Sequence, residues 1–244
     1  MTDPLTKALL EARNGGPKLP DTYGEGLTRE RIFAVQTEVA SALGSVGGFK
    51  VACPPGAPII IAPIMAHDIY ESPAKISLSE GEEAGVELEY AFRVIAPVPD
   101  TAAFDFETRL RDSVELLPAF ELVQSRLANP KGAGAALKML DNQLNGAVVL
   151  GEACRDWQGI DVTSGQAHLT LGDATLLDGV AKVPGEGAFA TLCALVRALG
   201  DHCGGLQPGH IVITGSLNGL PWVTPPITAQ GEIAGLGSVT MTLE

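Results

Sequence analysis

The chain has 244 residues, of which 45% are hydrophobic and 18% are charged, proportions typical of a globular protein with a substantial core. Its formal net charge of −13 at pH 7 would repel phosphate backbones, so we expect no nucleic-acid partner. The first twenty residues lack the apolar core of a signal peptide, and the longest apolar run, residues 57–66, is too short to span a bilayer. We therefore expect a cytoplasmic protein with no membrane association.

The first 50 residues predict two helices. Asp3 followed by Pro4 is typical of a helix start, and the leucines that follow would give this helix an apolar stripe. Thr28 is the expected N-cap of a second helix, in which apolar residues recur at helical spacing. The glycines of "GSVGGFK" (44–50) end that helix and begin an extended stretch.

The remainder of the chain is rich in strands. Short extended segments interrupted by Pro and Gly run from about residue 49 to 95, and the last of them reads "GVELEYAFRVI". The other expected elements are a short helix at 104–112, a buried strand at 116–127, a hairpin that turns at Gly172-Asp173, a helix at 187–202 and further strands up to the C-terminus. The fold class predicted from these elements is α+β.

Two glutamates, Glu87 and Glu89, interrupt the apolar strand "GVELEYAF". Alternate residues of a strand share a face, so both carboxylates would point the same way, with Val86, Leu88 and Tyr90 on the other face. In a partly buried site the two charges would repel unless a cation held them, and Mg²⁺, Mn²⁺ or Ca²⁺ prefers such oxygen ligands. The pattern equally fits a strand whose glutamates face solvent.

Several stretches together are similar to the 2-oxopent-4-enoate hydratase and 4-oxalocrotonate decarboxylase family of the fumarylacetoacetate hydrolase superfamily. They occur in the family's order over nearly the whole chain. They are "DTYGEGLT", "GGFKVA" (47–52), "GVELEYAFRV" (85–94), "LLPAFELVQSRL" (116–127), "LDNQLNGAVVLGE" (140–152), "LQPGHIVITGS" (206–216) and "GLGSVTMTLE" (235–244). The resemblance implies a mixed β-sheet roll with N-terminal helices. It also implies an N-terminal helical or α+β cap region (1–72) before a β-rich catalytic core (73–244), or one continuous domain.

The resemblance implies a site with a divalent metal ion, Mg²⁺ or Mn²⁺. Glu87 and Glu89 match two metal ligands of the family. The third ligand of the family is an acidic residue in a segment like "EIVDSRI", which reads "ELVQSRL" here, so the matching position is Gln124. The amide oxygen of a glutamine is still a ligand for a hard cation.

Other residues are assigned to the reaction by the same resemblance. Lys50 would transfer a proton, helped by a pKa lowered on burial, and Asp68 is the nearest acid to the family's second catalytic position. The segment Thr214-Gly215-Ser216 would lie beside the substrate carboxylate. Arg126 is a candidate for a distal carboxylate, although a structural ion pair is the alternative, and Asp141-Asn142 match a pair that we expect to be structural.

The function implied is that of a metal-dependent hydratase acting on short 2-hydroxy-dienoates or 2-oxo-enoates in aromatic catabolism of the meta-cleavage type. The alternatives are a 4-oxalocrotonate-type decarboxylase, a hydrolase of acylpyruvates, or a non-catalytic member whose metal site has decayed at Gln124. The expected partner is a small 2-oxo or 2-hydroxy acid. Assembly into a homo-oligomer is implied by the resemblance alone.

Overall fold

Two long antiparallel strands form the centre of the fold. The computed structural model describes residues 2–244, and in it β5 (Ala84–Val94) pairs with β6 (Val114–Val123) along their full lengths. Both strands are buried on both faces, which explains their long apolar runs. The expected strands at these positions are therefore confirmed, although β6 ends four residues earlier than the predicted segment.

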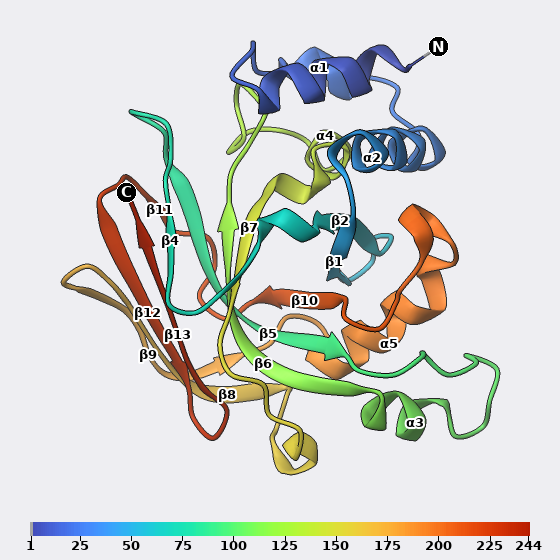
Figure 1. Ribbon diagram of the computed structural model, residues 1–244, viewed down its shortest axis with the longest axis vertical. Helices are drawn as coiled ribbons and strands as arrows, with labels where there is room; N and C mark the ends of the chain where they lie inside the picture. Colours follow the sequence, from blue (N-terminus) through green and yellow to red (C-terminus); the bar gives the residue numbers. More distant parts are fainter. Residues whose placement is uncertain (1) are drawn as a thin grey trace.

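Two mixed sheets curl around this centre (Figure 1). The larger has the order β2 (Ile60–Met65), β1 (Val46–Ala52), β10 (Ile211–Ser216), β5, β6, β7 (Asn145–Leu150) and β3 (Ile69–Glu71), with β11 (Trp222–Val223) paired to β5. The smaller has the order β4 (Ala74–Ile76), β13 (Gly237–Leu243), β12 (Ile227–Ile233), β8 (Ser164–Leu171) and β9 (Ala174–Lys182). The hairpin expected at Gly172-Asp173 joins β8 to β9.

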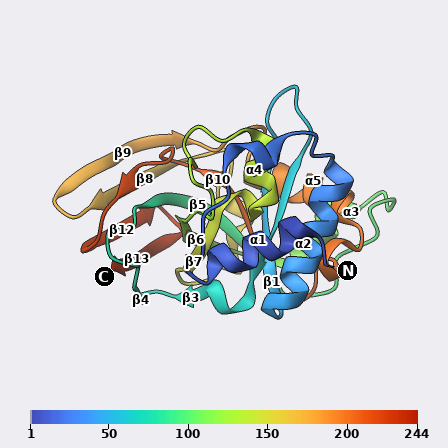
Figure 2. The ribbon, with the colours of Figure 1, turned by 90° about the horizontal axis from the view of Figure 1, so that it is seen from above.

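Helices cover one end of the larger sheet. The helix α1 (Pro4–Arg13) begins where the Asp3 side chain accepts a hydrogen bond from Leu5 N–H, and α2 (Arg29–Leu43) begins at Thr28, as predicted. Viewed from above, α1 and α2 lie across the larger sheet and away from the smaller one (Figure 2). The remaining helices are α3 (Phe106–Asp112), α4 (Ala135–Leu140) and α5 (Ala188–Leu199), and the 3-10 turns are η1 (Asp21–Gly24), η2 (Ala66–Asp68), η3 (Asn142–Leu144), η4 (Trp157–Gly159) and η5 (His202–Gly204).

The expected boundary at residue 72 falls within a shared sheet. Strands β1, β2 and β3 precede residue 72, but β1 pairs with β10 and β3 pairs with β7. The parts before and after the boundary therefore contribute to one hydrogen-bonded sheet.

The two faces of β5 and β6 have different surroundings. Leu88 and Phe120 face the smaller sheet, where they pack so closely on Gly231 that a Cβ at that position would lie 2.8 Å from each side chain. Ala91 and Ala119, on the opposite face, point into the curl of the larger sheet with Ile213. Side chains on this inner face are enclosed by the sheet itself, and the two glutamates of β5 lie on it. Within residues 2–244, no helix is long and apolar enough to cross a membrane.

Candidate active site

Three carboxylates, two of them buried and one half-buried, meet on the inner face of the larger sheet. Glu87 and Glu89 come from β5 and Glu121 from β6, and each offers one oxygen so that all three oxygens lie within 4.8 Å of one another. Glu89 is 1% exposed and Glu121 is 0% exposed. Buried carboxylates this close are rare unless a cation or a proton is shared between them.

The register of β5 and β6 creates this cluster. Glu87 lies directly opposite Glu121, and Glu89 lies opposite Ala119 on the same face. Like charges at directly opposed positions of a sheet are destabilising, so this pairing has no stabilising role in the metal-free fold. The arrangement is instead typical of a functional site.

Backbone and side-chain donors hold two of the carboxylates in place. Gly215 N–H donates to Glu89 Oε2 at 2.6 Å, and Asn145 Nδ2 donates to Glu121 Oε1 at 2.9 Å. Gly215 has a φ of +117°, a conformation that favours glycine, and it lies at an irregularity in the pairing of β10 with β5. The irregularity turns the Gly215 N–H towards Glu89.

Lys50 of β1 is the cation beside the cluster. Its Nζ lies 2.6 Å from Glu121 Oε2 and 3.8 Å from Glu87 Oε2, and it donates to the carbonyl of Gln143 at 3.3 Å. Gln143 and its two neighbours all have left-handed backbone conformations (φ 48–62°), which are unfavourable for residues other than glycine. The structure therefore holds a strained turn at the position where it reaches Lys50.

The electrostatics of the cluster follow from burial. Burial, reinforced by the charges of Glu121 and Glu87, raises the pKa of Glu89 well above its ordinary value. Burial raises the pKa of Glu87 to about 7, although the Lys50 ammonium opposes the shift. For Lys50 itself, burial favours the neutral amine, but the charges of Glu121, Glu87 and Glu89 outweigh it and raise the pKa of Lys50. Burial was expected to lower the pKa of Lys50, and this expectation is wrong for the metal-free protein. The neighbouring carboxylates favour the protonated form of Lys50.

The three carboxylates fit a divalent cation. They outnumber the single ammonium of Lys50, so the cluster has a net negative charge when all of these groups are ionised. Glu121 Oε2 is buried and accepts no hydrogen bond of good geometry from the described residues. Three carboxylate oxygens and no sulfur or imidazole are the donor set that Mg²⁺, Mn²⁺ or Ca²⁺ prefers. Glu87, Glu89 and Glu121 are thus the residues that could hold such an ion.

The third carboxylate of the cluster is Glu121, whereas the sequence led us to expect Gln124. The alternation of β6 explains the difference: Glu121 shares the inner face with Leu117 and Ala119, and Gln124 follows three residues later, beyond the end of the strand. The Gln124 side chain instead contacts Gly146 and lines a separate cavity. This geometry does not support Gln124 as a metal ligand, and that role stays a prediction.

Arg126 is occupied by contacts within the protein. Its Nε donates to Asp141 Oδ1, and its two Nη groups donate to the carbonyls of Gln124, Asn145 and Asp141, each at 2.9 Å. Four of its five N–H donors are therefore used, and the side chain is buried. This geometry supports the structural ion pair and not the expected binding of substrate. Asp141 has the structural role expected of it.

The other expected site residues divide into two groups. Ser216 pairs in register with Glu89, and Gly215 contacts Glu89 directly, so this segment adjoins the carboxylates. The Thr214 hydroxyl, however, donates to the carbonyl of Tyr90 at 3.1 Å, which ties two strands together. Asp68 lies in η2, 3.6 Å from His67, and makes no contact with Lys50 or the three glutamates among residues 2–244. Its catalytic role stays a prediction without support from this geometry.

Sequence reasoning missed Glu121 and Asn145. The signal for Glu121 was present, because it interrupts the apolar run "LLPAFELV" in the same way that Glu87 and Glu89 interrupt theirs. Comparing the two interrupted strands as an antiparallel pair would have placed the three carboxylates on one face. No pattern in the sequence distinguishes Asn145, whose role depends on the pairing of β7 with β6.

The two curled sheets with their covering helices define the class of fold, that of the fumarylacetoacetate hydrolase-type enzymes. The chain superimposes on 4-oxalocrotonate decarboxylase from Pseudomonas putida G7, solved with magnesium and adipate, with a TM-score of 0.80 and 16% sequence identity over 100% of this chain and 98% of that one. The same enzyme solved with calcium and acetate gives a TM-score of 0.79 at 17% identity, covering 98% of this chain and 96% of that one. Fumarylpyruvate hydrolase from Pseudomonas aeruginosa, solved with Mn²⁺ and pyruvate, gives 0.58 at 14% identity, covering 80% and 88%.

These likenesses confirm the α+β roll that the sequence predicts. No family model matches the sequence, and no curated protein matches it. At this level of identity the likeness establishes the fold alone.

The raised pKa of Glu87 predicts that metal binding strengthens as the pH rises. A metal ion must displace the proton from Glu87, whose pKa is about 7, so the affinity for Mg²⁺ should rise about tenfold or more from pH 6 to pH 8. The stability of the metal-free protein should change in the opposite direction. Between about pH 4.5 and 7 the folded state binds more protons than the unfolded state, so the free energy of unfolding falls as the pH rises.

Calorimetric titration of Mg²⁺ at pH 6, 7 and 8, with melting temperatures of the metal-free protein in the same buffers, checks both signs. An affinity that is flat over this range would show that Glu87 is already ionised, and hence that the carboxylates do not share a buried, repelling environment.

Proposed function

We propose that the protein is a divalent-metal-dependent lyase that acts on a short 2-oxo-enoate or 2-hydroxy-dienoate, as in aromatic catabolism. The single observation that carries this proposal is the buried cluster of Glu87, Glu89 and Glu121 with the Lys50 ammonium beside it. A divalent cation, once bound, supplies Lewis-acid stabilisation of negative charge on neighbouring oxygen atoms. Such stabilisation serves any reaction in which a 2-oxo acid passes through an enolate.

The chain's own residues have separable tasks in this reaction. Asn145 and Gly215 fix the orientation of Glu121 and Glu89, so that the carboxylates stand ready without rearrangement. Lys50, charged and enclosed, is placed to give a proton to a carbon of the enolate and to take one back in the reverse direction. The inner face around them is lined by small and aliphatic side chains such as Ala91 and Ile213, which limit the access of water.

Hydration and decarboxylation are both supported by this site. We favour a hydratase from the sequence resemblance, and the full-length likeness to 4-oxalocrotonate decarboxylase supports decarboxylation equally well. The non-catalytic alternative rested on Gln124 and on the missing acid after Lys50. Glu121 argues against the first reason, whereas the position of Asp68, away from Lys50, leaves the second in place. Assembly into a homo-oligomer remains a proposal that rests on the resemblance.

A substrate panel tests the proposal. The protein is supplied with Mg²⁺, Mn²⁺ or Ca²⁺ and mixed with 2-hydroxypenta-2,4-dienoate, 4-oxalocrotonate or fumarylpyruvate, while ultraviolet absorbance and CO₂ release are followed. We expect metal-dependent turnover of the dienoate without CO₂ release, or of oxalocrotonate with it, and loss of both with EDTA. Turnover of fumarylpyruvate alone would replace the lyase with a C–C hydrolase, and turnover that resists EDTA would contradict the role of the carboxylates.

A further inference from the structure

The turn η3, between α4 and β7 (Figure 1), is built from three consecutive residues in the left-handed backbone region. The φ angles of Asn142, Gln143 and Leu144 are +48°, +52° and +62°. Asparagine tolerates this conformation, but glutamine and leucine rarely adopt it, and left-handed residues usually occur singly. A run of three persists where the surrounding structure imposes it.

Arg126 holds both ends of this turn. Its Nη2 donates to the carbonyl of Asp141, immediately before the turn, and its Nη1 donates to the carbonyl of Asn145, immediately after it, each at 2.9 Å. Leu144 N–H also donates to the carbonyl of Asp141, at 2.8 Å. Because the guanidinium is planar and rigid, its two bonds fix the positions of the carbonyls on either side of the three residues. The chain between them is thereby kept in the left-handed region.

The ion pair of Arg126 with Asp141 is separate from these main-chain bonds. It uses Nε of the arginine and a side-chain oxygen of the aspartate. Any buried cation at position 126 would balance the charge of Asp141, whereas spanning two carbonyls needs the fork of donors that arginine has and lysine lacks. The geometry of Arg126 is therefore matched to the turn as well as to Asp141.

The turn determines the direction of the Lys50 ammonium. Lys50 Nζ lies 2.6 Å from Glu121 Oε2, but that contact lacks good hydrogen-bond geometry. The carbonyl of Gln143, at 3.3 Å, is the hydrogen-bond acceptor of Lys50 among residues 2–244. Charge attraction keeps Nζ near the carboxylates without orienting it. A hydrogen bond from one N–H of an ammonium, in contrast, also sets the directions of the other two.

We propose that Arg126 positions Lys50 for proton transfer, by holding the left-handed turn whose Gln143 carbonyl orients the ammonium. This inference rests on the proposed function, in which Lys50 gives a proton to a carbon of the enolate. In that step the enolate carbon forms a C–H bond with a proton of Lys50, the N–H electron pair stays on nitrogen, and solvent restores the proton. Arg126 and Gln143 are positioning residues, and they act through Lys50.

Arg126→Lys tests the hold on the turn, because lysine keeps a positive charge beside Asp141 but cannot span the two carbonyls. The values of kcat and KM are measured with Mg²⁺ for 2-hydroxypenta-2,4-dienoate and for 4-oxalocrotonate, and the Kd for Mg²⁺ is measured by calorimetry. For the substrate that the wild type converts, kcat should fall about 10- to 100-fold, while KM and the Kd for Mg²⁺ stay within about twofold.

The matched control is Arg93→Lys. Arg93 also forms an ion pair, with Glu71 at 3.1 Å, but it lies six residues beyond Glu87 on β5, roughly 20 Å along the strand. This variant should leave kcat, KM and the Kd for Mg²⁺ unchanged.

Gln143→Gly gives the answer if Arg126→Lys does not fold, because glycine adopts left-handed conformations without strain. The melting temperature of this variant should not fall, yet kcat should drop several-fold, since the carbonyl beside Lys50 is no longer held in one direction. Gln143→Asn should retain kcat, because asparagine tolerates the left-handed region. A turn with a structural role alone would lose no kcat when Gln143 is replaced by glycine.

Unchanged kcat in either Arg126→Lys or Gln143→Gly would overturn the inference and leave the proposed function intact. A loss of kcat with an equal weakening of Mg²⁺ binding would also overturn it, because the carboxylates and not Lys50 would then have moved. A wild type that converts neither substrate with Mg²⁺ would overturn the proposed function, and the inference with it.

Discussion

Glu121→Gln should abolish the stabilisation of this protein by divalent metal. At a metal concentration of about 100 times Kd, binding adds about 2.7 kcal/mol to the free energy of unfolding of the wild type. For a chain of this length that corresponds to a rise in melting temperature of roughly 5–11 °C. The substitution replaces a buried carboxylate by a neutral amide of the same shape, so the Mg²⁺-induced rise should disappear, and turnover should disappear with it.

A second prediction concerns the melting temperature of the metal-free variant. Glu121 is the nearest counter-charge of the enclosed Lys50 ammonium, at 2.6 Å, and the raised pKa values of Glu87 and Glu89 make those two groups weaker counter-charges. Metal-free Glu121→Gln should therefore melt below the metal-free wild type, because it leaves a buried ammonium without its closest partner. Gln124→Ala is the matched control from the same segment and should keep the full response to Mg²⁺. Loss of the response in Gln124→Ala, with retention in Glu121→Gln, would restore Gln124 as the ligand and contradict the geometry.

Lys50→Met should reduce turnover by about 10²- to 10⁴-fold, the usual contribution of one positioned acid or base. Methionine preserves much of the side-chain volume but removes the ammonium that lies 2.6 Å from Glu121. Binding of metal should persist and strengthen, because the cation no longer competes with a fixed positive charge for the same carboxylates. Turnover and the Kd for Mg²⁺ measured on the same preparation separate these two effects.

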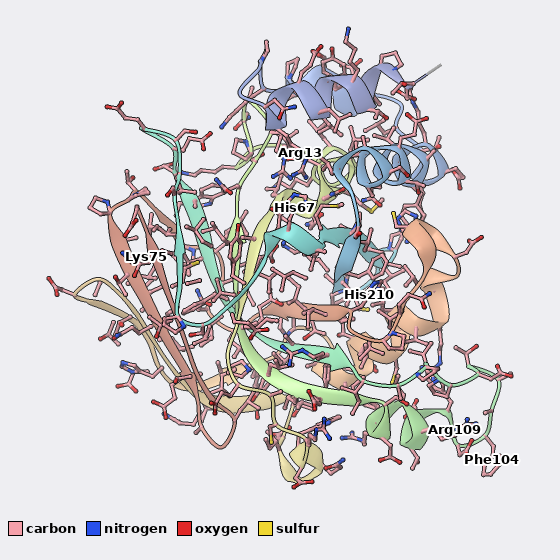
Figure 3. The ribbon with its side chains drawn as sticks, in the orientation of Figure 1. Arg13, His67, Lys75, Phe104, Arg109 and His210 are labelled. Atoms are coloured by element: carbon pink, nitrogen blue, oxygen red, sulfur yellow. The ribbon has the colours of Figure 1, made fainter. Side chains whose placement is uncertain are left out.

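The control for Lys50 is Lys75→Met. Lys75 also contacts a carboxylate at 2.6 Å, that of Glu244, but it lies on the exposed surface of the smaller sheet, away from the interior (Figure 3). A solvent-exposed pair of this kind contributes little, so neither turnover nor metal affinity should change. If Lys50→Met kept the same activity as Lys75→Met, Lys50 would have no part in the reaction. Its role would then be to balance the charge of the carboxylates.

The sequence by itself determined the local elements and the shared face of Glu87 and Glu89. Caps at Asp3 and Thr28 are short-range signals, since each depends on a side chain bonding to backbone a few residues away. The alternation of "GVELEYAF" placed Glu87 and Glu89 on one face of a strand, because the side-chain period of a strand is fixed by backbone geometry. These features need no knowledge of which segments meet.

Only the tertiary structure decided what those carboxylates face. Glu121 joins them through the register of β6, Lys50 through the parallel pairing of β1 with β10, and Asn145 through β7. Such contacts join residues far apart in the chain, as the hydrogen bond from Gly215 to Glu89 does over 126 positions. A shift of one residue in register would turn Glu121 to the opposite face. Periodicity fixes the direction of a side chain along its own strand or helix, whereas the register between segments fixes its neighbours.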